Sequence, residues 1–112
     1  MKERVFYGRL QSRKIPLLKK KNLNNFLKNQ KIENLFYRKK SKIIIEIGSG
    51  IGDNLFYLAK KYPRRKIIGV EPFKNGLANI AYFCEKHKIK NIYLFPFVFQ
   101  KFITKFQNFI FD

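Results

Sequence analysis

Apolar residues are concentrated in three short runs, residues 43–47, 66–71 and 91–95, that are separated by two amphipathic segments. Each run is rich in Ile, Val, Leu, Phe or Tyr, which is typical of buried strands. The first run is apolar at every position except Glu46. A strand that is apolar on both faces favours a parallel sheet.

Between these runs, apolar side chains recur at the spacing of one helix face. One helix is predicted from about residue 52 to 62, and Pro63 ends it because the residue before a proline disfavours the helical conformation. A second helix is predicted over about 75–88. The repeating residues are Leu55, Leu58, Ala59 and Tyr62 in the first helix, and Leu77, Ile80, Ala81 and Cys84 in the second.

The order β-α-β-α-β predicts an α/β fold with a doubly wound, Rossmann-like parallel sheet. Residues 42–112 are interpreted as a partial domain, because the pattern decays after the third strand and only residues 107–112 offer the start of a fourth. The second wall of a ligand crevice would then be nearly absent. Residues 1–41 are interpreted as a basic N-terminal arm with short helical cover. The arm itself spans residues 1–22, and residues 23–37 are expected to cover the domain with short helical or irregular structure.

The chain has a net charge of +18, and residues 1–42 carry +12 of it. A basic arm ahead of a less basic domain indicates a polyanionic partner, contacted by Arg4, Arg9, Arg13 and Lys14. The alternative is that a chain rich in Lys, Asn, Ile and Phe reflects biased codon usage.

Three glycines follow the first strand in the segment Gly48-Ser49-Gly50-Ile51-Gly52-Asp53. Glycine lets a backbone turn tightly and approach a ligand closely. The spacing differs from the Gly-x-Gly-x-x-Gly of dinucleotide sites, and Asp53 at the start of the next helix would repel a phosphate. Asp53 is itself interpreted as the N-cap of that helix.

Two acids stand at strand positions beside this turn. Glu46 lies within the first strand, where a carboxylate requires a partner, and Glu71 ends the second, where it can accept hydrogen bonds from both hydroxyls of a ribose. The alternative for Glu71 is an exposed strand-end acid. S-adenosylmethionine has no phosphate and carries an ammonium and a sulfonium. It is therefore the predicted cofactor, with Glu46, Gly48, Gly50, Gly52 and Glu71 as its binding residues.

Other chemistries find little support in the sequence. Cys84 is the one cysteine, so no internal disulfide can form, which suits a cytoplasmic protein. His87 is the one histidine, placed where a cation suits a helix end. No metal-ligand spacing, Ser/His/Asp set, secretory signal or membrane-length apolar run is present.

These motifs together resemble class I S-adenosylmethionine-dependent methyltransferases, and more narrowly the bacterial tRNA (guanine-N7-)-methyltransferases. Residues 45–53 resemble that family's L-E-I-G-x-G-x-G-E motif, residues 67–76 its F-I-G-V-E-x-x-x-x-G segment, residues 89–92 its L-x-N-[IL] motif, and residues 7–13 its basic arm. The resemblance implies cofactor contacts by Glu46 and Glu71, and methyl transfer to N7 of a guanine in tRNA. Because N7 is already an unprotonated nucleophile, catalysis would depend chiefly on positioning.

The chain also departs from this family. By spacing, Val98 stands where the family has an aspartate for the adenine end of the cofactor, and the P-D-P-W and T-D-x-x-x-Y segments are missing. We therefore expect a truncated copy of low or no activity, whose first strand leaves apolar surface open to association. Two alternatives remain: a non-catalytic basic RNA-binding fragment with a vestigial cofactor pocket, and another class I methyltransferase that acts on a small molecule or protein.

Overall fold

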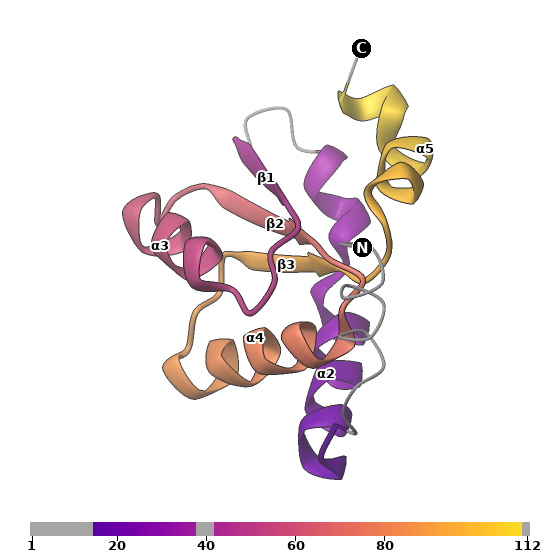
Figure 1. Ribbon diagram of the computed structural model, residues 1–112. Helices are drawn as coiled ribbons and strands as arrows, with labels where there is room; N and C mark the ends of the chain where they lie inside the picture. Colours follow the sequence, from indigo (N-terminus) through magenta and orange to yellow (C-terminus); the bar gives the residue numbers. More distant parts are fainter. Residues whose placement is uncertain (1–14, 38–41, 111–112) are drawn as a thin grey trace, which may run out of the picture.

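A computed structural model of the chain describes residues 15–37 and 42–110, with the side chains of Tyr37 and residues 107–110 left out. Its centre is a parallel sheet of three strands in the order β1-β2-β3 (Figure 1). The strands are β1 Ile43–Ile47, β2 Lys66–Val70 and β3 Ile92–Phe95, and the helices between them are α3 Asp53–Lys61 and α4 Lys74–His87. The predicted β-α-β-α-β order and the α/β fold class are confirmed, with boundaries within about one residue of those expected.

Alternate residues of the strands face two different hydrophobic layers. On one face, Ile67 of β2 and Leu94 of β3 pack with residues of α3 and α4, such as Leu55 and Leu77. On the other, Ile68 packs with residues of η1 and α5. Helices therefore cover both faces of the central strand, as expected for a sheet whose strands are apolar on both sides.

The N-terminal cover is more regular than predicted. Helix α2, Leu17–Gln30, begins inside the segment interpreted as an arm, and the 3-10 helix η1, Ile32–Tyr37, follows it. Leu23 is the buried residue of α2 and joins the layer formed by α3 and α4. The apolar pattern of this helix is weak, because most of its other positions are Lys or Asn.

The prediction that residues 107–112 start a fourth strand is wrong for the part of this segment that the structure describes. Residues 107–110 continue the helix α5, Phe99–Ile110. Phe102 and Phe106, one turn apart, are 0% and 2% exposed and pack against Phe95 of the sheet. The apolar residues after Phe95 therefore follow helical spacing, and burial of this phenylalanine face holds the segment on the sheet.

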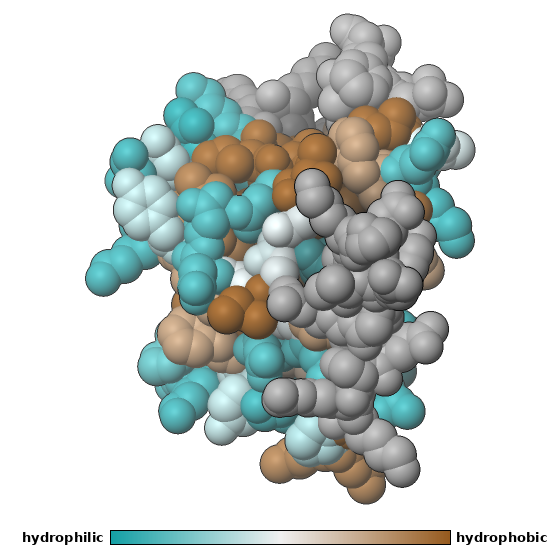
Figure 2. All heavy atoms as spheres, viewed as in Figure 1, coloured by the Kyte–Doolittle hydropathy of each residue, from teal (hydrophilic) through white to brown (hydrophobic). Residues whose placement is uncertain are grey.

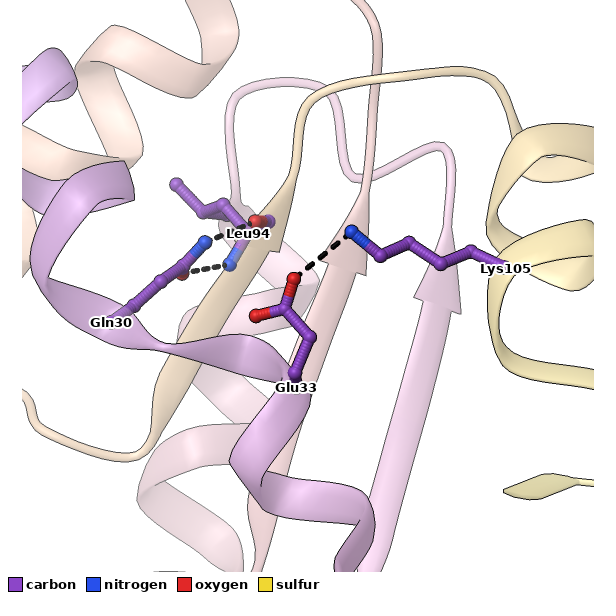
Figure 3. A network of polar contacts seen from close by, with 4 residues as sticks. All are labelled: Gln30, Glu33, Leu94 and Lys105. Atoms are coloured by element: carbon purple, nitrogen blue, oxygen red, sulfur yellow. Dashed lines mark hydrogen bonds and ion pairs between the residues drawn. The ribbon is translucent and has the colours of Figure 1, made fainter. Parts of the chain in front are cut away.

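The free edge of β3 is closed by a side chain from α2 (Figure 3). The amide of Gln30 donates to the carbonyl of Leu94 at 2.7 Å and accepts from its N–H at 2.8 Å. This side chain therefore occupies the two backbone groups that a neighbouring strand would use. Nearby, Lys105 of α5 lies 2.9 Å from the carboxylate of Glu33 in η1. Both contacts join segments more than 60 residues apart.

Candidate cofactor site at the carboxyl end of the sheet

The glycine loop turns sharply because three of its residues adopt positive φ angles. Gly48, Gly50 and Gly52 have φ of 77°, 58° and 99°, a region that residues with a Cβ adopt only at a cost. Gly48 still donates to the carbonyl of Val70 at 2.8 Å, and Gly52 donates to that of Ser49 at 2.9 Å. The first bond extends the pairing of β1 with β2, and the second closes the turn from which α3 starts.

Glu71 joins this loop to the segment that follows β2. One carboxylate oxygen accepts from the N–H of Gly50 at 2.7 Å, and the other accepts from the N–H of Phe73 at 2.9 Å. The residue is only 4% exposed, so the interpretation of an exposed strand-end acid is wrong. Two charge-assisted bonds compensate for burying this carboxylate. Each oxygen still has capacity to accept another hydrogen bond.

Glu46 lies on the neighbouring strand, directly across from Gly69. Its Oε2 accepts from the side-chain amide of Asn54 at 2.6 Å. Its Oε1 is buried and has no hydrogen-bond partner among the described residues, and the same holds for Oγ of Ser49 in the loop. Two buried oxygens with unmet hydrogen-bonding capacity at one corner favour a polar ligand there, because a buried polar atom without a partner is costly.

The site also depends on two glycines that are not among the predicted binding residues. A Cβ on Gly76 of α4 would lie 2.1 Å from the carbonyl oxygen of Gly50, and one on Gly69 would lie 2.6 Å from Oγ of Ser49. Both are therefore required for the glycine loop to lie directly on α4 and β2. They belong to the segment 67–76 compared with a family motif, and that glycine spacing was the available signal.

Space for a ligand lies over the other side of the loop. A Cβ on Gly48 or Gly50 would meet nothing within 4 Å. The open backbone of the loop and the carboxylates of Glu46 and Glu71 fit a ligand that carries hydroxyls and a positive charge. The residues present thus suit an adenosylated sulfonium.

Other predicted residues have different outcomes. The N-cap of α3 is Gly52, and Asp53 is the first helical residue, so the N-cap interpretation of Asp53 is wrong. Val98 is exposed just before α5 and offers no side-chain acceptor. The four residues predicted to bind RNA, Arg4, Arg9, Arg13 and Lys14, lie outside the described residues.

The two other residues considered from the sequence, Cys84 and His87, pack against their neighbours. Burial raises the pKa of the Cys84 thiol from 9.0 to about 12, which keeps it protonated and unreactive. His87 packs its ring on Phe83, with centroids 4.1 Å apart. Within the described part of the chain, no three His, Cys, Asp or Glu residues are grouped to hold a metal ion. No described helix is both long and apolar enough to cross a membrane.

A broad open groove lies elsewhere, between α2, α4 and β3, with a volume of about 880 Å³. None of the five predicted cofactor residues lines it. Its lining mixes amides, lysines and apolar groups, among them Asn25, Asn29, Lys88, Lys90 and Tyr93. It is therefore distinct from the corner that Glu46 and Glu71 form.

Comparison with known proteins places the chain in a family. Residues 40–109 match the family described as "Putative methyltransferase". This chain belongs to that family. Membership implies a methyl donor of the S-adenosylmethionine type.

The chain is also similar to individual methyltransferases. A tRNA (guanine-N(7)-)-methyltransferase of Bartonella henselae is 35% identical over 96 residues, which cover 76% of this chain and 41% of the relative. One of Neorickettsia sennetsu is 34% identical over 87 residues, covering 77% and 38%. A bifunctional methyltransferase of Rickettsia prowazekii is 43% identical over 61 residues, covering 54% and 12%. The chain thus spans about two fifths of the length of the first two relatives.

Proposed function

We propose that this chain binds the cofactor for a reaction in which a methyl group is transferred from S-adenosylmethionine to N7 of a guanine in tRNA. The proposal rests on the arrangement of two carboxylates beside the glycine loop. Glu71 accepts hydrogen bonds from Gly50 and Phe73, and beside it Oε1 of Glu46 is buried without a hydrogen-bond partner among the described residues. The names of the similar tRNA methyltransferases support the acceptor. Such a substrate would place the reaction in the cytoplasm.

The residues of this chain would act by binding and orientation. S-adenosylmethionine would supply an electrophilic methyl group on a sulfonium. Glu46 suits the ammonium of its amino-acid end, and Glu71 suits its ribose hydroxyls. The N–H groups of Gly48, Gly50 and Gly52 already donate within the protein, so their role is to shape the open turn. Guanine N7 requires no base to activate it, so holding the two reactants in line would provide most of the rate.

One pair of observations favours the alternative of an RNA-binding fragment with a vestigial pocket. Both oxygens of Glu71 already accept backbone N–H groups. Val98, at the position compared with the adenine-reading aspartate, has an apolar side chain. A pocket with these features would hold the adenosyl group less firmly than one with a free acceptor at each end.

Titration calorimetry with S-adenosylmethionine tests the cofactor assignment. Glu46→Gln keeps an oxygen for Asn54 but removes the charge, and we expect affinity to fall by about 10- to 100-fold, the effect of losing one charge-assisted hydrogen bond of about 1.5–3 kcal/mol. Glu85→Gln, an exposed carboxylate on α4, is the matched control and should bind as the unaltered chain does. Equal affinity in the two variants would remove Glu46 from the site, and no binding by the unaltered chain would favour the vestigial pocket.

The acceptor is tested with two tRNA transcripts, one ordinary and one made with 7-deazaguanosine, in which a carbon replaces N7. Labelled methyl groups should enter the ordinary transcript and not the deaza transcript. Label in both transcripts would place the acceptor at another atom. Cofactor binding without label in either would leave the chain as a cofactor-binding unit that does not complete the transfer.

A further inference from the structure

Positive charge gathers at the edge of the sheet where the strands begin, opposite the glycine loop. Two loops, taken with the ends of the elements they join, form this basic edge. Residues 60–66 run from the end of α3 to the first residue of β2, and residues 86–91 run from the end of α4 to the start of β3. The first holds five Lys or Arg residues and the second holds three, and neither holds an acid. Both loops lie at the left of Figure 1, where Figure 2 shows hydrophilic side chains interspersed with apolar ones.

The two loops are held together by one side chain. The amide nitrogen of Asn91 lies within hydrogen-bond distance of three carbonyl oxygens, those of Ala59 at 3.1 Å, Tyr62 at 3.2 Å and Arg65 at 3.1 Å. Lys66 also donates through its backbone N–H to the carbonyl of Lys42 at 3.0 Å. The cations of both loops are therefore carried on a fixed backbone, which lowers the entropy cost of binding a ligand that touches several of them.

Aromatic rings hold two of these cations at the surface. The Nζ of Lys61 lies 5.6 Å from the ring centre of Tyr57 and 5.5 Å from that of Tyr62. The guanidinium of Arg65 lies 4.8 Å from the ring centre of Tyr62 on the same loop. Cation–π contacts orient a charge but do not neutralise it.

Within residues 15–37 and 42–110, no carboxylate forms an ion pair with a cation of this edge. Among the side chains that the structure describes, the one ion pair joins Lys105 to Glu33, far from these loops. Glu85, the acid nearest in sequence, lies beside the side-chain amide of Asn22 when that amide is oriented to donate to it. Lys60, Arg64, Lys88 and Lys90 are exposed and none has a carboxylate partner within the described part of the chain.

We infer that the basic edge is a second contact surface for the phosphate backbone of tRNA, separate from the N-terminal arm and from the cofactor corner. The inference rests on the proposed function for the identity of the polyanion. Strands of four or five residues separate this edge from the glycine loop, roughly 15 Å at 3.3 Å per residue. The surface therefore positions RNA without touching the reacting guanine, as phosphate contacts do in general.

The test measures tRNA binding against salt concentration, without a methyl donor. In one variant, Lys60→Gln, Arg64→Gln and Lys90→Gln remove three exposed charges from the two loops. In the control, Lys28→Gln, Lys31→Gln and Lys101→Gln remove three exposed charges from α2, its C-cap and α5, all outside the basic arm. Each lost phosphate contact lowers the slope of log K against log salt by about 0.7–0.9. We expect the edge variant to lose about 2 to 3 in slope and the control to lose less than about 1.

Each outcome is informative. Equal losses in both variants would show that net charge alone attracts the RNA and would overturn the inference. Loss of binding to phosphatidylserine vesicles by the edge variant, with tRNA binding intact, would assign the edge to a membrane surface instead. A slope change in a chain that binds no S-adenosylmethionine would support the edge while refuting the proposed methyl transfer, so the two proposals can fail separately.

Discussion

At the scale of single residues, the corner at the end of the sheet depends on glycines of two kinds. Gly48, Gly50 and Gly52 provide positive φ angles, which a sequence motif reveals directly. Gly76 has an ordinary helical conformation, and it is a glycine because the carbonyl oxygen of Gly50 lies against it. The need for glycine at position 76 arises from contact between two segments distant in the sequence. A motif therefore shows that a glycine stands there but not why.

This contact decides the sign of a substitution. An alanine in a helix is normally more stable than a glycine by about 1 kcal/mol. We expect Gly76→Ala to be destabilising instead, by about 1–3 kcal/mol, because its Cβ would overlap Gly50 and push the loop away. Urea denaturation measures the change, and Lys86→Ala, an exposed site on the same helix, should stay within about 0.5 kcal/mol of the unaltered chain. A stabilised Gly76→Ala variant would show that the loop does not lie on α4.

At the scale of elements, the two outer strands are treated differently. The outer edge of β3 is occupied by the side chain of Gln30, which takes both a donor and an acceptor of Leu94. β1 is the opposite edge strand of the sheet, and the structure describes no strand beside it. One edge is therefore closed by α2, and the other presents its backbone groups to any further strand.

Removing this closure gives a measurable effect. Gln30→Ala leaves the N–H and carbonyl of Leu94 without their side-chain partner. We expect a loss of about 1–3 kcal/mol in the free energy of unfolding and faster hydrogen exchange of the Leu94 amide. Asn29→Ala, the exposed neighbour on the same helix, should change neither. Unchanged exchange at Leu94 in both variants would show that solvent satisfies this edge as well as Gln30 does.

At the scale of the whole molecule, apolar surface and positive charge act against each other. The residues of β1 are only partly buried, and Ile47 is 56% exposed. Figure 2 shows a hydrophobic patch where Figure 1 places β1. Burial of this surface favours association, whereas a net charge of +18 opposes it at low salt. Association should therefore increase as salt screens the repulsion.

Sedimentation velocity at raised salt tests whether β1 is the associating edge. Ile47→Lys puts a charge on the edge strand, where it should block pairing and reduce association. Ile51→Lys adds the same charge in the adjoining loop at an equally exposed isoleucine, 56% in both cases. We expect only the strand variant to remain monomeric. Equal effects would indicate that general hydrophobicity, not strand pairing, drives association.

The amino-acid pattern was sufficient to predict the features that depend on residues close together in the sequence. Strand runs, helix spacing and the glycine turn are read from neighbouring residues, and parallel pairing then brings Glu46 and Glu71 to one edge of the sheet. The C-terminal segment differs: residues 107–112 were predicted to start a strand, but residues 107–110 are helical. The phenylalanine face of this helix becomes favourable only when the sheet is present to bury it.

Tertiary structure alone decided the contacts between distant segments. Gln30 meets Leu94 across 64 residues, Glu33 meets Lys105 across 72, and Asn91 joins two loops. It also decided that Glu71 holds the glycine loop through Gly50. Such pairings follow from how layers pack, and local sequence carries no record of them because the energy that selects each partner is gained only when the whole fold forms.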